Sequence, residues 1–109
     1  MAVEYMQGAE LPDVAFTWTD EETGLLDFST GWSFTVRVGI SGSPALIEKT
    51  VGISGAATAP NVIIAWEPDE LDVLAVGTYD VDVIARNDGT SKDRKATFPL
   101  LMSSAVAAP

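Results

Sequence analysis

Residues 78–86 read TYDVDVIAR, and this stretch decides the fold class of the chain. Every second position is apolar, namely Tyr79, Val81, Val83 and Ala85. The positions between them are polar or charged, namely Thr78, Asp80, Asp82 and Arg86, with Ile84 as the exception. Successive side chains of a strand point to opposite faces, so this alternation predicts a β-strand with one buried and one solvated face. Charged residues on the outer face make a slip in strand register costly.

The same alternation recurs on the N-terminal side of this stretch. It is found at residues 14–19 and 32–40, which predicts two further half-buried strands. Weaker strands, rich in β-branched or bulky apolar residues, are predicted at 46–53, 62–66 and 96–102. Pro99 lacks the amide hydrogen that a sheet ladder needs, so the last of these strands is expected at a sheet edge or with a bulge.

Turn-forming residues separate the predicted strands. They lie at 20–24, 41–44, 54–55 and 87–90. The segment 68–76 differs, because Leu71 and Leu74 lie three positions apart after acidic residues, and it predicts one short helical turn near 69–75. No long helix is predicted, and a parallel βαβ architecture needs one between its strands. The pattern therefore favours an all-β fold, either an antiparallel sandwich or a small barrel.

The length and charge of the chain limit its organisation and its partners. A chain of 109 residues fits one domain. We expect a sandwich domain over residues 1–102 and a flexible C-terminal arm over the small, uncharged residues 103–109. No window approaches the roughly 18 apolar residues of a membrane span, so no membrane partner is expected. The formal net charge is −10, which opposes binding to nucleic acid.

The sequence offers few groups for catalysis. It contains no cysteine and no histidine, which removes thiolate chemistry and the commonest general base and metal ligand. The acidic segments 20–22 and 69–72 lack the ligand spacing of a calcium loop. Asp80 and Asp82 share a strand face about 7 Å apart, a spacing that catalytic carboxylates use, but an exposed acidic face explains them more simply. We therefore expect no enzyme activity, no cofactor and no metal site.

Two further clusters have a structural and a functional interpretation. Trp18, Trp32 and Trp66 could stack on a sugar, but all three lie in phase with the apolar faces of their strands, which favours core packing. Three of the six basic residues cluster near the C-terminus, namely Lys92, Arg94 and Lys95. A solvated hairpin is favoured there over a docking spot for an acidic partner.

An ordered set of short motifs links the chain to a known family. Residues 16–18 read FTW, residues 27–34 read DFSTGWSF, residues 71–79 run from a leucine to a Gly-Thr-Tyr corner, and residues 87–89 read NDG. In this order, over residues 13–102, the chain resembles the small immunoglobulin-like domains of tailed-bacteriophage tail and baseplate proteins, such as the N-terminal domain of the baseplate upper protein. The resemblance implies an antiparallel immunoglobulin-like β-sandwich of about seven strands. Tyr79 would then bond back to the backbone of a corner, as in other sandwich domains.

The resemblance also implies a function. The resemblance implies that the chain is a structural protein of the phage particle, in the tail, the tail tip or baseplate, or the head-to-tail region. The chain would assemble in the host cytoplasm into the virion, as a homo-oligomer within the particle and with other virion structural proteins as partners. A carbohydrate- or receptor-binding module and a capsid decoration protein stay open as alternatives. The candidate interface residues are Val3, Tyr5, Met6, Ile63, Ile84, Met102 and Val106.

Overall fold

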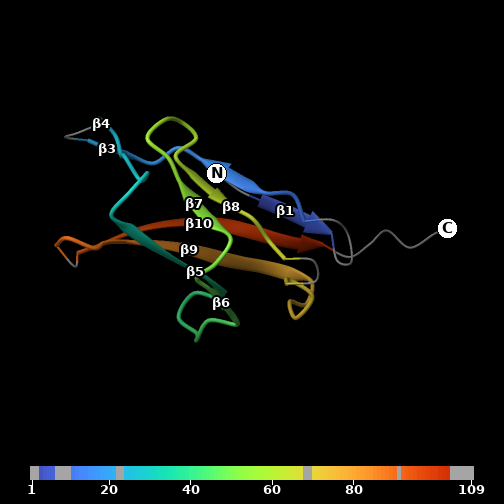
Figure 1. The fold of residues 1–109 in the computed structure, drawn as a ribbon. Helices are drawn as coiled ribbons and strands as arrows, with labels where there is room; N and C mark the ends of the chain where they lie inside the picture. The colour runs from blue at the N-terminus through green and yellow to red at the C-terminus, as the bar shows by residue number, and fades with distance from the viewer. Residues whose placement is uncertain (1–2, 7–10, 22–23, 68–69, 91, 104–109) are drawn as a thin grey trace.

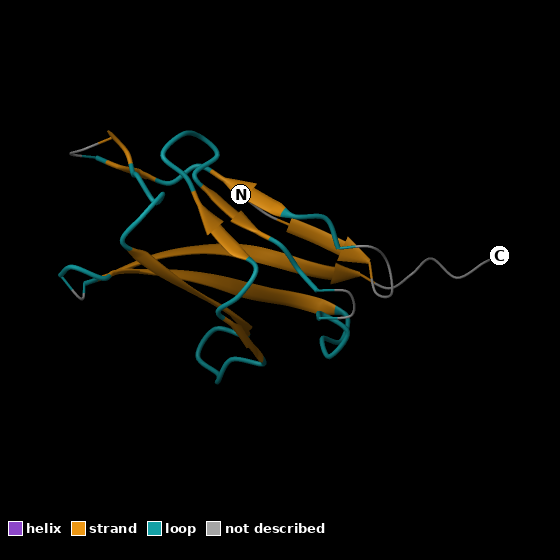
Figure 2. Cartoon of the chain, in the orientation of Figure 1, coloured by secondary structure: helices purple, strands orange, loops and turns teal. Residues whose placement is uncertain are grey.

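The computed structural model describes residues 3–6, 11–21, 24–67, 70–90 and 92–103, and over these ranges the chain is all-β, without a helix (Figure 1, Figure 2). The strands are β1 (Val3–Met6), β2 (Val14–Phe16), β3 (Thr19–Asp20), β4 (Gly24–Leu25), β5 (Trp32–Gly39), β6 (Ile47–Lys49), β7 (Ile53–Gly55), β8 (Val62–Ile64), β9 (Gly77–Asn87) and β10 (Asp93–Ser103). The prediction of an all-β fold is therefore confirmed. The described residues form ten strands where about seven were expected, and several of the ten are only two or three residues long.

The strands of the described residues form two sheets and one short hairpin. The larger sheet has the order β1-β10-β9-β5-β6, the smaller one has the order β2-β8-β7, and β3 pairs with β4. Every pair of neighbouring strands is antiparallel except β1 and β10, which run parallel with Val3 opposite Leu100 and Met6 opposite Ser103. In Figure 1 the strands of the smaller sheet lie across those of the larger one, which gives a sandwich-like arrangement.

The hydrophobic core lies between the two sheets. The apolar positions of the deciding stretch, Tyr79, Val81, Val83 and Ala85, are at most 6% exposed, as their alternation predicted. The smaller sheet contributes Val14, Val62 and Ile64 to the same core. Complete burial of a valine or isoleucine side chain stabilises the fold by about 1.5–3 kcal/mol. A one-residue slip of β9 would replace its buried side chains with Asp80, Asp82 and Arg86, so burial fixes the register.

The helical turn predicted near 69–75 is not seen in the described residues of that segment. Residues 70–73 form turns instead. The amide of Glu70 donates to the carbonyl of Glu67 at 3.1 Å, and the amide of Leu74 donates to the carbonyl of Leu71 at 3.0 Å. Two separate short-range bonds do not nucleate a helix. Leu71 and Leu74 are each 1% exposed, so burial rather than helix formation holds the segment in place.

The single strand predicted at 46–53 is two strands, β6 and β7, which belong to different sheets. Gly52 lies between them with a φ of 75°, in the left-handed region that favours glycine. A Cβ atom at this position would lie 2.7 Å from the carbonyl oxygen of Ala65. The chain therefore changes sheets at a point where only glycine fits. This crossing brings Lys49, the last residue of β6, close to Ala65, just beyond β8.

The expectation that residues 96–102 form an edge strand is wrong, because β10 has β9 on one side and β1 on the other. Pro99 lies opposite Asp80 of β9, and the pairing with β1 starts one residue later, at Leu100. Among the described residues, β10 therefore has a neighbour on only one side at Pro99. A residue without an amide hydrogen is tolerated at such a position.

Candidate functional site

Two of the predicted interface residues are buried inside the chain and are not available to a partner. Tyr5 is 6% exposed and Met102 is 2% exposed. They lie opposite each other in the parallel pair of β1 and β10, and both belong to the core. The prediction was wrong for these residues because β1 joins the larger sheet and turns Tyr5 inward together with Met102.

Ile63 and Ile84 lie on separate surfaces. Ile84 is half-buried on the outer face of the larger sheet, between Thr35 of β5 and Lys95 of β10. Ile63 is half-buried on the outer face of the smaller sheet, between β2 and β7. Because the two sheets share one core and turn their outer faces away from each other, these isoleucines do not form one patch.

The remaining candidate interface residues differ in how exposed they are. Val3 is half-buried and packs against the core, whereas Met6 is 42% exposed on β1. Val106 lies outside the described residues, as does most of the predicted arm 103–109. Sequence reasoning missed the other exposed large apolar residues, which are Leu25, Ile40, Leu46, Val51, Val73, Val76 and Leu101. Most of them lie in loops and turns, where a periodic pattern gives no direction for a side chain.

The three tryptophans pack against the core and do not form an open platform. Trp66 is 8% exposed, and Trp18 and Trp32 are half-buried. The ring of Phe28 lies between the latter two, with centroid distances of 5.4 Å to Trp18 and 4.9 Å to Trp32. Tilted and edge-to-face contacts of this kind stabilise a core. The interpretation as core residues is therefore supported over a surface for sugar stacking.

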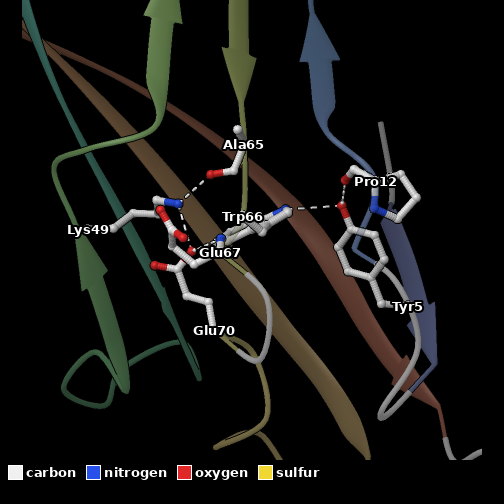
Figure 3. Close-up of polar contacts among 7 residues, drawn as sticks. All are labelled: Tyr5, Pro12, Lys49, Ala65, Trp66, Glu67 and Glu70. Atoms are coloured by element: carbon white, nitrogen blue, oxygen red, sulfur yellow. Dashed lines mark hydrogen bonds and ion pairs between the residues drawn. The ribbon is translucent and has the colours of Figure 1, made fainter.

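A buried polar network connects β1, the segment after it and the end of β8 (Figure 3). The hydroxyl of Tyr5 donates to the carbonyl of Pro12 at 2.6 Å, and the indole Nε1 of Trp66 donates to the same hydroxyl at 3.0 Å. The Tyr5 hydroxyl and the Trp66 Nε1 therefore each have a partner in a contact that is removed from water, which is the condition for burying them without a large penalty. The network ties β1 to the segment that follows β8.

The neighbouring part of the network is centred on a buried cation (Figure 3). The Lys49 side chain is 3% exposed, and its Nζ donates to the carbonyl of Ala65 at 2.6 Å and to Oε1 of Glu70 at 2.7 Å. The same Nζ lies 4.9 Å from the centre of the Trp66 ring, within cation–π range. Oε1 of Glu70 also accepts from the amide of Glu67 at 3.0 Å. Both charged groups thus have partners within the chain, which supports a structural role for the pair.

The tyrosine corner expected from the sequence has a counterpart in the structure. The hydroxyl of Tyr79, near the start of β9, donates to the carbonyl of Ala75 at 2.7 Å, four residues earlier in the chain. The Tyr79 side chain itself is buried. The bond ties the segment before β9 to the strand.

The pKa of Tyr5 provides a test of the buried network. Burial raises this pKa above its ordinary value of 10.0, and the hydrogen bond from Trp66 opposes the rise. The folded chain therefore holds the proton more tightly than the unfolded chain. The resulting stabilisation is present below pH 10 and is lost as the pH rises through the folded pKa.

We expect the free energy of unfolding, measured with urea from about pH 8 to 11.5, to fall less steeply in Tyr5→Phe than in the unsubstituted chain. Tyr79→Phe is the matched control and should keep the steeper decline, and an unchanged slope in Tyr5→Phe would contradict this account.

The described residues contain no cluster of three or more acidic, histidine or cysteine side chains that could hold a metal ion. The acidic segments 20–22 and 69–72 each include a residue outside the described ranges. In the described part of the chain, no helix is long and apolar enough to span a membrane.

No protein-family model, curated protein or solved structure matches the chain.

The basic cluster near the C-terminus is largely paired within the chain. Arg94 contacts Asp20 at 2.5 Å, which links β10 to the β3–β4 hairpin. Lys95 contacts Asp82 at 3.6 Å on the outer face of the larger sheet. Lys92 is exposed in the connection between β9 and β10. These contacts support the interpretation of a solvated hairpin.

One hollow lies on the outer face of the larger sheet, where the β5–β6 loop stands beside the strands. Its volume is about 550 Å³. The strands contribute polar side chains to its wall, and residues 40–45 of the loop complete it. We call this feature the outer hollow. Asp80 and Asp82 are among the residues that line it.

Proposed function

We propose that the chain is an immunoglobulin-like sandwich domain that acts as a structural component of a tailed-bacteriophage particle through protein–protein interfaces. The observation that carries the proposal is the strand order, with the parallel β1–β10 pair at one side of the five-stranded sheet and β2-β8-β7 opposite. Immunoglobulin-like domains place their strands in two such sheets and use Greek-key connections between them. The motifs that resemble phage tail and baseplate domains fall on this framework.

The bond of Tyr79 to Ala75 supports the same proposal. In immunoglobulin-like domains a tyrosine near the start of a late strand bonds to the backbone a few residues upstream. Tyr79 is the third residue of β9, and its partner lies four residues earlier. The buried valine at position 81 then takes the place where antibody domains have a cysteine, two residues after the tyrosine. This substitution fits a chain without cysteine.

The arrangement of polar groups supports binding rather than catalysis. In the described residues every buried side-chain nitrogen or oxygen has a hydrogen-bond partner within the chain. Such groups hold a fold rigid, and a rigid sandwich presents its loops and outer faces to partners. Exposed apolar residues in the loops, such as Val73 at 72% and Val51 at 66%, offer surface for such contacts.

A particle-capture experiment tests the proposal. The isolated chain is analysed by size-exclusion chromatography with multi-angle light scattering, alone and after mixing with particles assembled without it. We expect the chain to move to the particle fraction in a fixed ratio, because interface burial is its function. An unrelated acidic domain of equal size serves as the control. A chain that stays monomeric and does not join the particle contradicts the proposal.

A further inference from the structure

The outer hollow is formed by the close approach of a loop to a strand. The amide of Leu46 donates to the carbonyl of Val38 at 2.8 Å, and the amide of Ser43 donates to the carbonyl of Ile40 at 2.9 Å, which closes the loop. A Cβ atom on Gly39 would lie 3.2 Å from Cα of Ala45 and 3.3 Å from the carbonyl oxygen of Pro44. The glycine therefore allows the loop to stand directly against β5, and the hollow forms beside it.

The same glycine leaves Asp80 uncovered within the hollow. Asp80 lies between Gly39 of β5 and Pro99 of β10. The first neighbour has no side chain and the second has no polar group on its side chain, so neither offers a donor to the carboxylate. In the described structure the carboxylate of Asp80 makes no hydrogen bond and no ion pair, although the residue is half-buried.

The other charges of the hollow are already paired. Arg37 donates to Glu48 at 2.9 Å, and Lys95 lies 3.6 Å from Asp82. Thr97 also donates to Asp82, at 2.8 Å. Two cations thus face three carboxylates, and the carboxylate left over is that of Asp80. A partly desolvated carboxylate without a partner attracts a cation that can reach it.

We propose that the outer hollow receives a lysine or arginine side chain of a partner protein, with its cationic head at Asp80 and its aliphatic stem on the loop. Ile40 lines the hollow and is 55% exposed, which gives an apolar wall for the stem. The net charge of −10 steers a basic segment toward the chain. This inference rests on the proposed function, because it names the chemistry of one partner in the interfaces.

The lining of the hollow favours this occupant over a sugar or a nucleotide. No aromatic side chain lines it, so a sugar ring or a base would have no surface on which to stack. An anionic ligand would have to displace Glu48 or Asp82 from the cations that they occupy. A cationic side chain needs neither change, because Asp80 is free to receive it.

A peptide titration followed by NMR tests the inference on the full chain. The probe is a blocked five-residue peptide with one arginine between glycines, and the reference peptide carries neutral citrulline in place of the arginine. We expect amide shifts at residues 39–43, at Ala45, at Asp80 and at Thr97 with the arginine peptide only, and we expect them to weaken with salt. Equal shifts with the citrulline peptide, or shifts scattered over the whole surface, would overturn the inference.

Variants separate the hollow from a general attraction between opposite charges. Asp80→Asn should lower the affinity for the arginine peptide about tenfold. Asp72→Asn removes the same charge from an exposed turn and should leave this affinity unchanged. Lys95→Gln should tighten binding severalfold, because it releases the Asp82 carboxylate, which lines the same hollow as Asp80 and can then also attract the cationic head. A simple loss of structure would not produce a gain. Equal affinities of Asp80→Asn and Asp72→Asn would refute the inference.

The particle experiment distinguishes failure of this inference from failure of the proposed function. If Asp80→Asn joins the particle as tightly as the unsubstituted chain, the hollow is not the contact, although the structural role stands. If the arginine peptide binds at Asp80 but the chain does not join the particle, the hollow is a site for a basic segment and the particle role is wrong. Peptide binding at Asp80 together with weaker capture of Asp80→Asn supports both.

Discussion

Replacing Asn61 by alanine is expected to lower the free energy of unfolding by about 4 kcal/mol, a large effect for a single polar substitution. Asn61 is fully buried. Its Oδ1 accepts from the amide of Trp18 at 2.7 Å, and its Nδ2 donates to the carbonyls of Trp18 and Leu26, both at 2.8 Å. The carbonyl of Trp18 keeps a second bond, from the amide of Leu26. The substitution therefore leaves the Trp18 amide and the Leu26 carbonyl without partners, and each such loss costs about 1–3 kcal/mol.

Urea denaturation followed by tryptophan fluorescence measures this effect. The matched control is Asn87→Ala, since Asn87 also bonds to backbone amides through its side chain, those of Gly89 and Thr90, but in an exposed turn. Water replaces the lost bonds there, so the control should lose about 1 kcal/mol or less. Equal losses in the two variants would show that Asn61 does not hold the segments around Trp18 and Leu26 in place.

Glu70→Ala is expected to destabilise the chain by about 3 kcal/mol, because it leaves the Lys49 ammonium buried with a single carbonyl partner. Removing both charges should be less harmful than removing one. The double variant Lys49→Met/Glu70→Ala is therefore expected to be more stable than Glu70→Ala, since methionine fills the space beside the Trp66 ring without a charge.

The control for this pair lies on the surface. Glu48→Ala breaks an ion pair with Arg37 whose side chains are 48% and 55% exposed, so it should cost less than about 1 kcal/mol. All variants are compared by urea denaturation at neutral pH. A double variant that is less stable than Glu70→Ala would mean that Lys49 contributes chiefly through its bond to Ala65 and its contact with Trp66.

The sequence predicted the elements whose side chains follow a simple period. The alternation around Val81 and Val83 identified β9 and its buried face, because strand geometry alone determines which side chains point inward. The same reasoning placed Trp66 in the core. It failed at Gly52, where a strand pattern continues through a change of sheet that is fixed by contact with Ala65.

The buried polar residues could not be predicted from the sequence. Lys49 and Asn61 are of types that usually lie on the surface, and their burial depends on partners that are remote in the chain, 21 residues away for Glu70 and 43 for Trp18. The outer hollow was missed for a similar reason. Asp80 and Asp82 were expected to keep one sheet face solvated, and only the fold shows that a loop stands beside them and that Asp82 alone is paired.

The parallel pairing of β1 with β10 has a mechanical consequence. Val3 begins one strand and Ser103 ends the other, so the two residues lie at opposite ends of the same pair of strands. A pulling force applied at these two residues acts along the strands, and the backbone hydrogen bonds between them carry the load together instead of opening one after another. If the chain were stretched or twisted, this short pair would resist the separation of β1 from the rest of the larger sheet.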